Sequence, residues 1–364
     1  MECVHTPELR YGEFSENLHK KAADKRIPIS GSLELTFRCN LRCQHCYAAH
    51  GHQGIPGKQE LTYEEIQNIF DEIVDAGCLW FLITGGEPLM RRDFLDIYKS
   101  AKGKGLIVTL FTNGTMLTPR IADYLAEWRP FAIEISLYGS TQATYEHVTG
   151  IPGSFSRCIR GIELLLERDL PLRLKAMLMT INKHELVEMQ AYAKSLDVEF
   201  RFDPIVDPGL ENSLAPLPLR LSPEEVVQIE RSDTERATLW SQQFTKVTKK
   251  PDNPRFLYSC GAGRSSFHID PYGKMSLCIS ERMPGYNLRK GSFQQGWDTA
   301  IPSHLRLEFS EGNICAECDL REVCPICPAL ARREHGDPQV CVDYFCQITH
   351  LRAETFSIKD GIII

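Results

Sequence analysis

Cysteines stand in groups along this sequence, and their spacing predicts metal chemistry. The segment LTFRCNLRCQHCYAAH, residues 35–50, carries the first group, namely Cys39, Cys43 and Cys46. The second half of the chain carries the others, namely Cys260, Cys278, Cys315, Cys318, Cys324, Cys327, Cys341 and Cys346. The start of the chain has no secretion signal, and a cytoplasmic chain keeps its thiols reduced, so these groups indicate metal binding or catalysis. We expect the three isolated cysteines to be ordinary thiols, namely Cys3, Cys78 and Cys158.

The first group has three thiols, whereas a structural zinc site takes four protein ligands. No fourth Cys or His has a suitable spacing; His45 and His50 are nearby, and we expect His45 to be packed or exposed. A redox pair of Cys43 and Cys46 would leave Cys39 without a role. An iron–sulfur cluster is the third alternative, because three thiolates would hold a cubane and leave one iron open.

Alternating strands and helices must position these thiols. We predict strands at 32–37, 79–84, 106–112, 131–137, 171–180 and 198–206. We predict helices at 62–77, 92–103, 118–127, 154–168 and 183–195. Thr62 and Glu65 form a capping-box pattern at the first helix, and Gly77 ends it. The alternation predicts a parallel α/β sheet, either an open barrel or a doubly wound sheet, with its site at the carboxyl ends of the strands.

Unusual loops follow four successive strands, so they should meet at that edge. The cysteine loop follows the first strand and GGEP (85–88) the second. TNG (112–114) follows the third strand and SLYG (136–139) the fourth. This convergence indicates one site built from several loops.

The strand–helix pattern ends at residue 206, and the chain is predicted to fall into five parts: an N-terminal segment (1–30), the barrel (31–206), a connecting loop and helix (207–254), a small Cys-rich domain (255–350) and a tail (351–364). We predict one helix over 222–240, capped by Ser222 with Pro223 in its first turn. KKPDNP (249–254) is a predicted boundary. We expect short elements in the Cys-rich part, with a hairpin over 266–278.

Composition excludes several classes of function. The chain has 364 residues and a net charge of −7, which argues against a protein built to hold nucleic acid. No apolar run reaches the roughly 20 residues that span a bilayer, so no membrane segment is predicted. We therefore expect a cytoplasmic protein of globular composition.

The segment CNLRCQHCY resembles the C-x3-C-x2-C signature of the radical S-adenosylmethionine (SAM) enzymes. GGEP, TNG and SLYG resemble the later motifs of this family, so the resemblance covers roughly residues 30–205 as a partial (β/α)6 TIM-like barrel. It implies that Cys39, Cys43 and Cys46 hold a [4Fe-4S] cluster whose open iron is chelated by SAM. One electron would then cleave SAM into methionine and a 5′-deoxyadenosyl radical, which takes hydrogen from a substrate.

The resemblance also implies a set of residues that contact SAM, namely Tyr47, Gly85, Gly86, Glu87, Pro88, Thr112, Asn113, Ser136 and Lys175. Tyr47 would lie against the adenine, and the two glycines would let the backbone approach a ligand. Glu87 would accept a hydrogen bond or hold its loop. The alternatives are ordinary ones, with Tyr47 as a core residue and Lys175 as a solvated charge at the barrel rim.

The C-terminal cysteines resemble the SPASM extension of radical SAM enzymes, which binds auxiliary clusters. The resemblance implies a first auxiliary [4Fe-4S] cluster on Cys260, Cys278 and Cys327, and three clusters in the whole chain. It implies a second on Cys315, Cys318, Cys324 and Cys346. Cys341 would complete the first cluster or stay free, and two residues separate Cys324 from Cys327 where the pattern has three. Zinc is the alternative metal here.

SPASM-type enzymes mostly modify ribosomally made peptides or proteins, by crosslinks, decarboxylation or oxidation to formylglycine. Ile279 stands where the sulfatase-maturing branch has a catalytic Asp, which argues against that branch. With about 30 residues before the barrel, leader binding would need a separate partner protein or would not occur. We therefore expect an oxidative peptide-modifying enzyme, supplied with electrons by a flavodoxin or ferredoxin. The alternatives are an enzyme of cofactor or haem biosynthesis, a zinc-binding interaction module and an electron-transfer protein.

Overall fold

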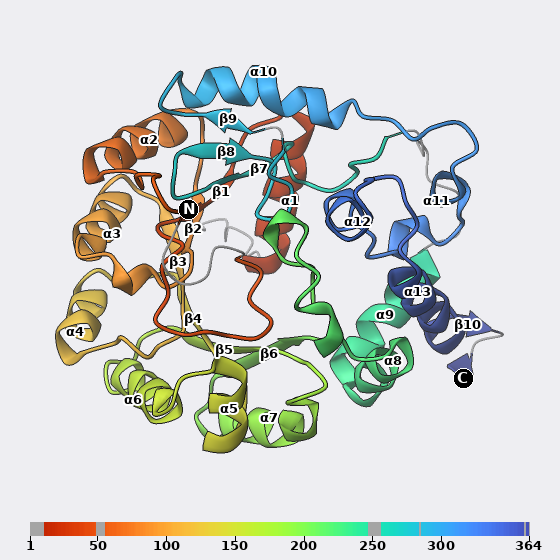
Figure 1. Ribbon diagram of the computed structural model, residues 1–364, viewed down its shortest axis with the longest axis horizontal. Helices are drawn as coiled ribbons and strands as arrows, with labels where there is room; N and C mark the ends of the chain where they lie inside the picture. The colour runs from red at the N-terminus through yellow and green to blue at the C-terminus, as the bar shows by residue number, and fades with distance from the viewer. Residues whose placement is uncertain (1–10, 49–54, 247–255, 284, 360–361, 364) are drawn as a thin grey trace, which may run out of the picture.

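A curved sheet of nine strands is the frame of the molecule (Figure 1). The computed structural model describes residues 11–48, 55–246, 256–283, 285–359 and 362–363. Six parallel strands follow one another in the sheet, namely β1 (Ser30–Glu34), β2 (Trp80–Thr84), β3 (Ile107–Thr112), β4 (Ala132–Ser136), β5 (Leu172–Met177) and β6 (Glu199–Asp203). This arrangement confirms the predicted partial barrel.

The connecting helices pack around the outside of the curved sheet (Figure 1). They are α2 (Tyr63–Asp75), α3 (Phe94–Gly103), α4 (Pro119–Glu127), α6 (Ser154–Leu166) and α7 (Leu186–Ser195), the last preceded by a 3₁₀ turn at Lys183–Glu185. Phe70 of α2 meets Phe81 of β2 edge-on, with ring centroids 5.4 Å apart. The predicted capping box at Thr62 and Glu65 is present, and Gly77 follows the helix with a φ of +101°. Local sequence signals therefore set these helix ends.

Two helix predictions need correction. Helix α5 (Gln142–Thr149) was not predicted, although Thr141 caps it and Gly150, with a φ of +66°, ends it. The helix predicted over 222–240 is two helices, α8 (Pro223–Ser232) and α9 (Thr234–Lys246). Asp233 breaks the chain between them because its backbone is extended and its carboxylate accepts a hydrogen bond from the Arg236 N–H, at 3.0 Å. The predicted cap at Ser222 is present.

The C-terminal part continues the same sheet. Strand β7 (Ser266–Ile269) pairs in parallel with β1, and β8 (Lys274–Ser276) and β9 (Tyr286–Asn287) follow in antiparallel. This confirms the predicted hairpin. The expectation of only short elements here was wrong, because the region also contains α10 (Phe293–Leu305), α11 (Ile314–Glu317), α12 (Pro328–His335) and α13 (Asp343–Phe356). Buried aromatic side chains such as Trp297 and Phe345 anchor the longer helices.

Helix α13 packs against α8 and α9 (Figure 1). A buried ion pair joins them, since Arg352 of α13 donates two hydrogen bonds to Glu230 of α8, at 2.8 and 2.6 Å. The same guanidinium lies over the ring of Trp240 in α9, 4.1 Å from its centroid. A two-stranded hairpin, β10 (Ile358–Lys359) and β11 (Ile362–Ile363), follows α13.

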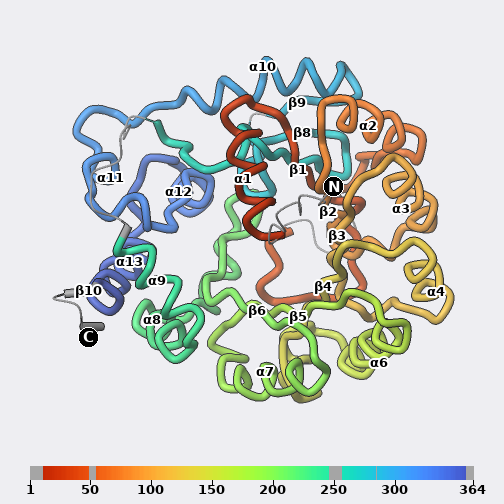
Figure 2. Tube along the Cα trace, turned by 180° about the vertical axis from the view of Figure 1, so that it is seen from behind, coloured from red at the N-terminus to blue at the C-terminus, as the bar shows by residue number. Residues whose placement is uncertain are grey.

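Helix α1 (Tyr11–Asp24) lies in front of the strands when the molecule is seen from behind (Figure 2). Its Tyr11 hydroxyl accepts a hydrogen bond from Trp80 at the start of β2, and its His19 bonds to Ser30 at the start of β1, both at 2.6 Å. The helix thus covers the amino ends of the strands and leaves the carboxyl ends to the site. None of the helices within the described ranges is long and apolar enough to cross a membrane.

Candidate active site

A cavity of about 640 Å³ opens at the carboxyl ends of the strands. Ten of the predicted site residues line it, namely Cys39, Cys43, Cys46, Tyr47, Gly85, Gly86, Thr112, Asn113, Ser136 and Lys175. The predicted Glu87 and Pro88 lie behind this wall, both buried. Side chains from the ends of β1 to β5 therefore converge on one space, as parallel strands require.

The three thiols of the cysteine loop are largely shielded from water. Burial raises the pKa of Cys39 to about 12 and raises the pKa of Cys43 and Cys46 as well. The backbone N–H of Leu41 donates to the Cys39 sulfur at 3.4 Å, and the Asn113 amide does so at 3.8 Å. These thiols stay neutral until a cation replaces their protons, and the N–H donors then stabilise the thiolate.

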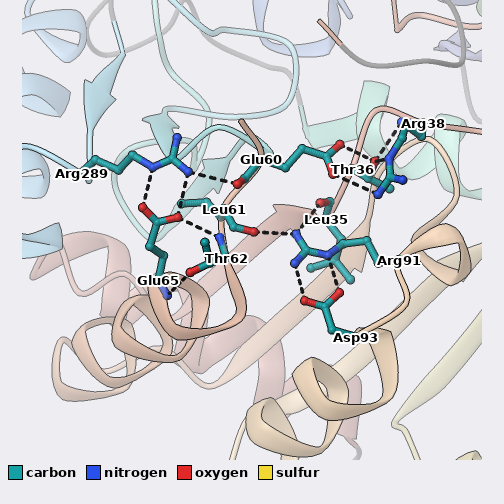
Figure 3. A network of polar contacts seen from close by, with 10 residues as sticks. All are labelled: Leu35, Thr36, Arg38, Glu60, Leu61, Thr62, Glu65, Arg91, Asp93 and Arg289. Carbon is teal, nitrogen blue, oxygen red and sulfur yellow. Dashed lines mark hydrogen bonds and ion pairs between the residues drawn. The ribbon is translucent and has the colours of Figure 1, made fainter. Parts of the chain in front are cut away.

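A polar network fixes the strand end that leads into the cysteine loop (Figure 3). The buried Arg91 donates to the carbonyls of Leu35 and Leu61, at 3.3 and 2.8 Å, and pairs with Asp93 at 2.6 Å. Next to it, Glu60 accepts from both Thr36 and Arg38 (Figure 3). The backbone before Cys39 is thereby tied to the segment before α2.

Helix α5 supports the cysteine loop from another side. The N–H groups of Arg42 and Gln44 donate to the carbonyls of Thr149 and Val148, at 2.8 and 3.1 Å. A Cβ atom at Gly150 would stand 3.0 Å from the Arg42 carbonyl oxygen, so the helix end and the loop are in close contact. The helix that the sequence did not reveal is thus one of the supports of the thiols.

The two glycines of GGEP serve a close backbone contact. A Cβ atom added to Gly85 would lie 2.4 Å from the carbonyl oxygen of Thr36. A Cβ atom added to Gly86 would lie 2.4 Å from the carbonyl oxygen of Arg38. The Gly86 N–H donates to the Thr36 carbonyl at 2.7 Å. We expected these glycines to allow approach of a ligand; the close approach that the structure contains is to the cysteine loop itself.

Glu87 links GGEP to the TNG loop. Its carboxylate accepts hydrogen bonds from the Thr112 hydroxyl at 2.8 Å, the Asn113 N–H at 2.7 Å and the Leu89 N–H at 3.1 Å. Burial raises its pKa to about 7, against the effect of these donors. Glu87 therefore accepts hydrogen bonds and holds its loop through them, and Pro88 begins the 3₁₀ turn behind it, Pro88–Met90.

Tyr47 borders the cavity and also belongs to a buried network. Its hydroxyl donates to Glu34 at 2.8 Å, and Glu34 pairs with Arg282 at 2.8 Å. His268 lies 3.2 Å from the same carboxylate and 2.9 Å from Ser32, and burial lowers its pKa. Arg282 and the neighbouring His268 hold the pKa of Glu34 at about 2 in spite of burial. The network joins the cysteine loop to the segment after Cys278.

Lys175 lines the cavity, and its ammonium group has a lowered pKa. Burial lowers its pKa to about 7, although Glu134 lies 3.7 Å away and opposes that effect. Its ammonium lies 3.0 Å from the ring centroid of Phe111. His45 is buried, with its pKa lowered to about 4, and its ring packs against Tyr138 at 4.6 Å. Within the described residues, its Nδ1 has no hydrogen-bond partner.

The C-terminal cysteines fall into two groups. The thiols of Cys260 and Cys278 are the neighbours of Cys327, whose pKa burial raises to about 11. The second group contains five thiols, namely Cys315, Cys318, Cys324, Cys341 and Cys346. Cys315 and Cys346 are the neighbours of Cys341, so Cys341 stands with the second group and not the first. Among the described residues, no group of Cys, His, Asp or Glu is arranged to hold a single metal ion.

Several cavity residues were not predicted, namely Arg201, Asp203, Asp207, Arg236 and Arg333. The first three stand in or just after β6, so the rule that sites lie at the carboxyl ends of strands could have found them. The other two come from α9 and α12, and no local pattern in the sequence marks them. Cys78 and Cys158 are buried free thiols away from the cavity lining, as expected, whereas Cys3 lies outside the described residues.

Residues 33–194 match the family described as the Radical SAM superfamily. An AdoMet-dependent heme synthase of Methanosarcina barkeri is 27% identical over 335 residues, which cover 84% of this chain and 92% of that protein. The mycofactocin maturase MftC of Mycobacterium ulcerans is 29% identical over 308 residues, with 82% of each chain covered. Both alignments thus extend well beyond the barrel.

Solved structures share the fold at low sequence identity. Streptococcus suis SuiB bound to its precursor peptide SuiA has a TM-score of 0.71 at 15% identity, covering 95% of this chain and 84% of that chain. The anSMEcpe structure with bound AdoMet and Cp18Cys peptide has a TM-score of 0.63 at 17% identity, covering 90% and 96%. The likeness therefore includes the Cys-rich C-terminal region.

The radical SAM superfamily implies a [4Fe-4S] cluster and SAM as cofactors, and the residues of this site fit them. Three largely shielded thiols border one cavity, N–H donors point at a thiol, and the volume lies in the range of small-molecule sites. The predicted resemblance to the radical SAM superfamily is confirmed by the match over residues 33–194.

Proposed function

We propose that this protein is a radical SAM enzyme that oxidatively modifies a ribosomally made peptide or protein. The observation that carries the proposal is a single cavity bordered by Cys39, Cys43 and Cys46 on one side and by Ile279 and Ser280, next to Cys278, on another. A substrate in that cavity would lie between two groups of thiols. The match of the fold to SuiB, solved with a precursor peptide, supports this class of substrate.

The chain's own residues divide the work around the cavity. Cys39, Cys43 and Cys46 would hold the cluster through their sulfurs, and the lining residues Tyr47, Thr112, Asn113, Ser136 and Lys175 would contact SAM. When bound, the cluster and SAM would supply the radical chemistry that removes a hydrogen atom from the substrate. The low pKa of Glu34 keeps a charge beneath Tyr47, which fixes the ring at the cavity edge.

The C-terminal region, 255–350, would hold two auxiliary [4Fe-4S] clusters beside the barrel at 31–206. Cys260, Cys278 and Cys327 supply three thiolates to the first, which leaves one iron without a cysteine. Cys315, Cys318, Cys324 and Cys346 hold the second, with Cys341 as a fifth thiol beside them. An electron donor of the flavodoxin or ferredoxin type and a separate leader-binding protein complete the proposal.

A small-molecule reaction in haem or cofactor biosynthesis is the second candidate. The alignment with the AdoMet-dependent heme synthase favours it, because 92% of that protein is covered. A cavity of about 640 Å³ is also in the size range of cofactor sites. The two candidates share the radical chemistry and differ in the substrate alone.

Anaerobic reconstitution tests both the radical SAM activity and the auxiliary clusters. With dithionite and SAM, the enzyme should form 5′-deoxyadenosine and carry about twelve irons per chain, because each cubane holds four. Cys39→Ala should abolish 5′-deoxyadenosine and leave the auxiliary iron. No 5′-deoxyadenosine from fully loaded enzyme would refute radical SAM activity, and about four irons would refute the auxiliary clusters.

Two probes then separate the candidates. The mycofactocin precursor peptide and iron coproporphyrin III are each offered to the loaded enzyme, and the products are identified by mass spectrometry. A mass change in the peptide supports the first candidate, and conversion of the porphyrin without change in the peptide favours the second. Cys39→Ala is the control, since it removes the chemistry that both candidates share.

A further inference from the structure

The segment after β6 carries a carboxylate into the cavity. Asp207 lines the cavity together with the three thiols of the cysteine loop. Its segment is tied to that loop, because the Leu210 N–H donates to the Tyr47 carbonyl at 2.6 Å. The position of Asp207 is thus fixed relative to the proposed SAM site.

The same segment is held from the auxiliary side as well. Arg333 of α12 donates to the Pro208 carbonyl at 3.2 Å, and α12 begins directly after Cys327. Arg220 donates to the Val206 carbonyl at 2.8 Å. Its guanidinium also forms two hydrogen bonds with a glutamate of α12, at 3.0 and 2.8 Å. Asp207 therefore stands on a braced segment between the first cysteine loop and the Cys327 helix.

The Asp207 carboxylate lies near charged side chains but is not held by hydrogen bonds within the described residues. Within the described part of the chain, no group donates a hydrogen bond to it, whereas Asp203, the other acid in the cavity wall, accepts one from Ile205 at 2.9 Å. Burial raises the pKa of Asp207 to about 6, and the nearby Asp203 raises it further. Arg333 and Arg220 oppose this effect, and Glu334 adds to it.

We propose that Asp207 is the proton acceptor for the substrate in this cavity. The inference rests on the proposed function and adds a residue to it. Loss of a hydrogen atom leaves a radical carbon next to an X–H group of the substrate. The X–H bond breaks, its proton goes to an Asp207 oxygen, and its electron pair stays to form the C=X bond. One electron then leaves to an iron–sulfur cluster as the oxidant, so the product is closed-shell.

Substitution separates this role from a structural one. Asp207→Asn should lower product formation from whichever of the two probes is converted by about 10²- to 10⁴-fold, the usual share of a general base, and keep 5′-deoxyadenosine formation. Asp207→Glu should recover part of the rate. In the parent enzyme the rate should fall below about pH 6, and Asp207→Asn should lack that dependence. Asp197→Asn, in an exposed turn, is the unchanged control.

A titration independent of turnover completes the test. The carboxyl C=O stretch of the reconstituted enzyme, followed by difference infrared spectroscopy, should show a group that titrates near pH 6 and is absent from Asp207→Asn. Absence of that band overturns the inference, as does full product formation by Asp207→Asn while 5′-deoxyadenosine is made. If the parent enzyme makes no 5′-deoxyadenosine, the proposed function falls and the inference with it.

Discussion

Glu34 offers a quantitative test of the buried network under Tyr47. Its side chain has no exposed surface, and it is paired with Arg282 at 2.8 Å and hydrogen-bonded by Tyr47 at 2.8 Å. Glu34→Gln keeps the shape of the side chain and removes the charge. Arg282 then stays buried with no opposite charge in this network, and its Nη2 already lacks a hydrogen-bond partner among the described residues.

Two lines of reasoning give the same magnitude for the loss of stability caused by Glu34→Gln. The pKa of Glu34 is lowered from 4.5 to about 2, which corresponds to about 3 kcal/mol in favour of the charged form. Removal of one partner from a buried ion pair costs about 3–5 kcal/mol in other proteins. We therefore expect Glu34→Gln to lower the free energy of unfolding by about 3 kcal/mol at neutral pH.

The effect has a definite pH dependence. A carboxylate with a lowered pKa contributes its full stability above pH 4.5 and loses it as the pH falls toward about 2. The parent protein should therefore lose stability over this window more steeply than Glu34→Gln. Urea titrations of the full-length chain under anaerobic conditions, between pH 7 and pH 3, measure both quantities.

Glu199→Gln is the matched control, because Glu199 is also a strand glutamate paired with an arginine, at 2.9 Å, but at the surface. Its loss should cost under about 1 kcal/mol. Equal effects of the two substitutions, or a Glu34→Gln effect below about 1 kcal/mol, would contradict the assignment of a buried, charge-paired network. Such a result would mean that water reaches Arg282.

Three further predictions follow from the contacts. Gly86→Ala should push the cysteine loop away and reduce the iron bound there. Gly103→Ala is the control and should leave the bound iron unchanged, because there is open space around its Cβ. An iron assay together with absorbance at the cluster band measures both variants. Cys341→Ser should leave the auxiliary iron content unchanged, because four thiols remain in the second group, and Cys324→Ser should lower it by about four irons per chain. Arg352→Met should lower the free energy of unfolding, measured in urea, by about 3–5 kcal/mol, because its partner Glu230 stays buried and charged. A loss under about 1 kcal/mol would contradict this prediction.

The sequence by itself determined the chemistry and the frame. Thiol spacing is a local property, and it indicated a site with three cysteines and an open position. The alternation of strands and helices and the right-handed crossover rule placed GGEP, TNG and SLYG at one edge. Local caps such as Thr62 with Glu65 set helix ends, because the hydrogen bonds involved span only a few residues.

Tertiary structure decided what depends on contacts between distant residues. Cys341 joins the second group of thiols because the fold brings it to Cys315, and spacing along the chain could not settle that. The glycines of GGEP are required by the backbone at Thr36 and Arg38, some fifty positions earlier. Asp207 has no motif around it; it became a candidate only because hydrogen bonds from two sides hold its segment in the cavity wall. Such contacts produce no periodic pattern in the sequence, since each depends on the relative positions of two separate elements in the fold.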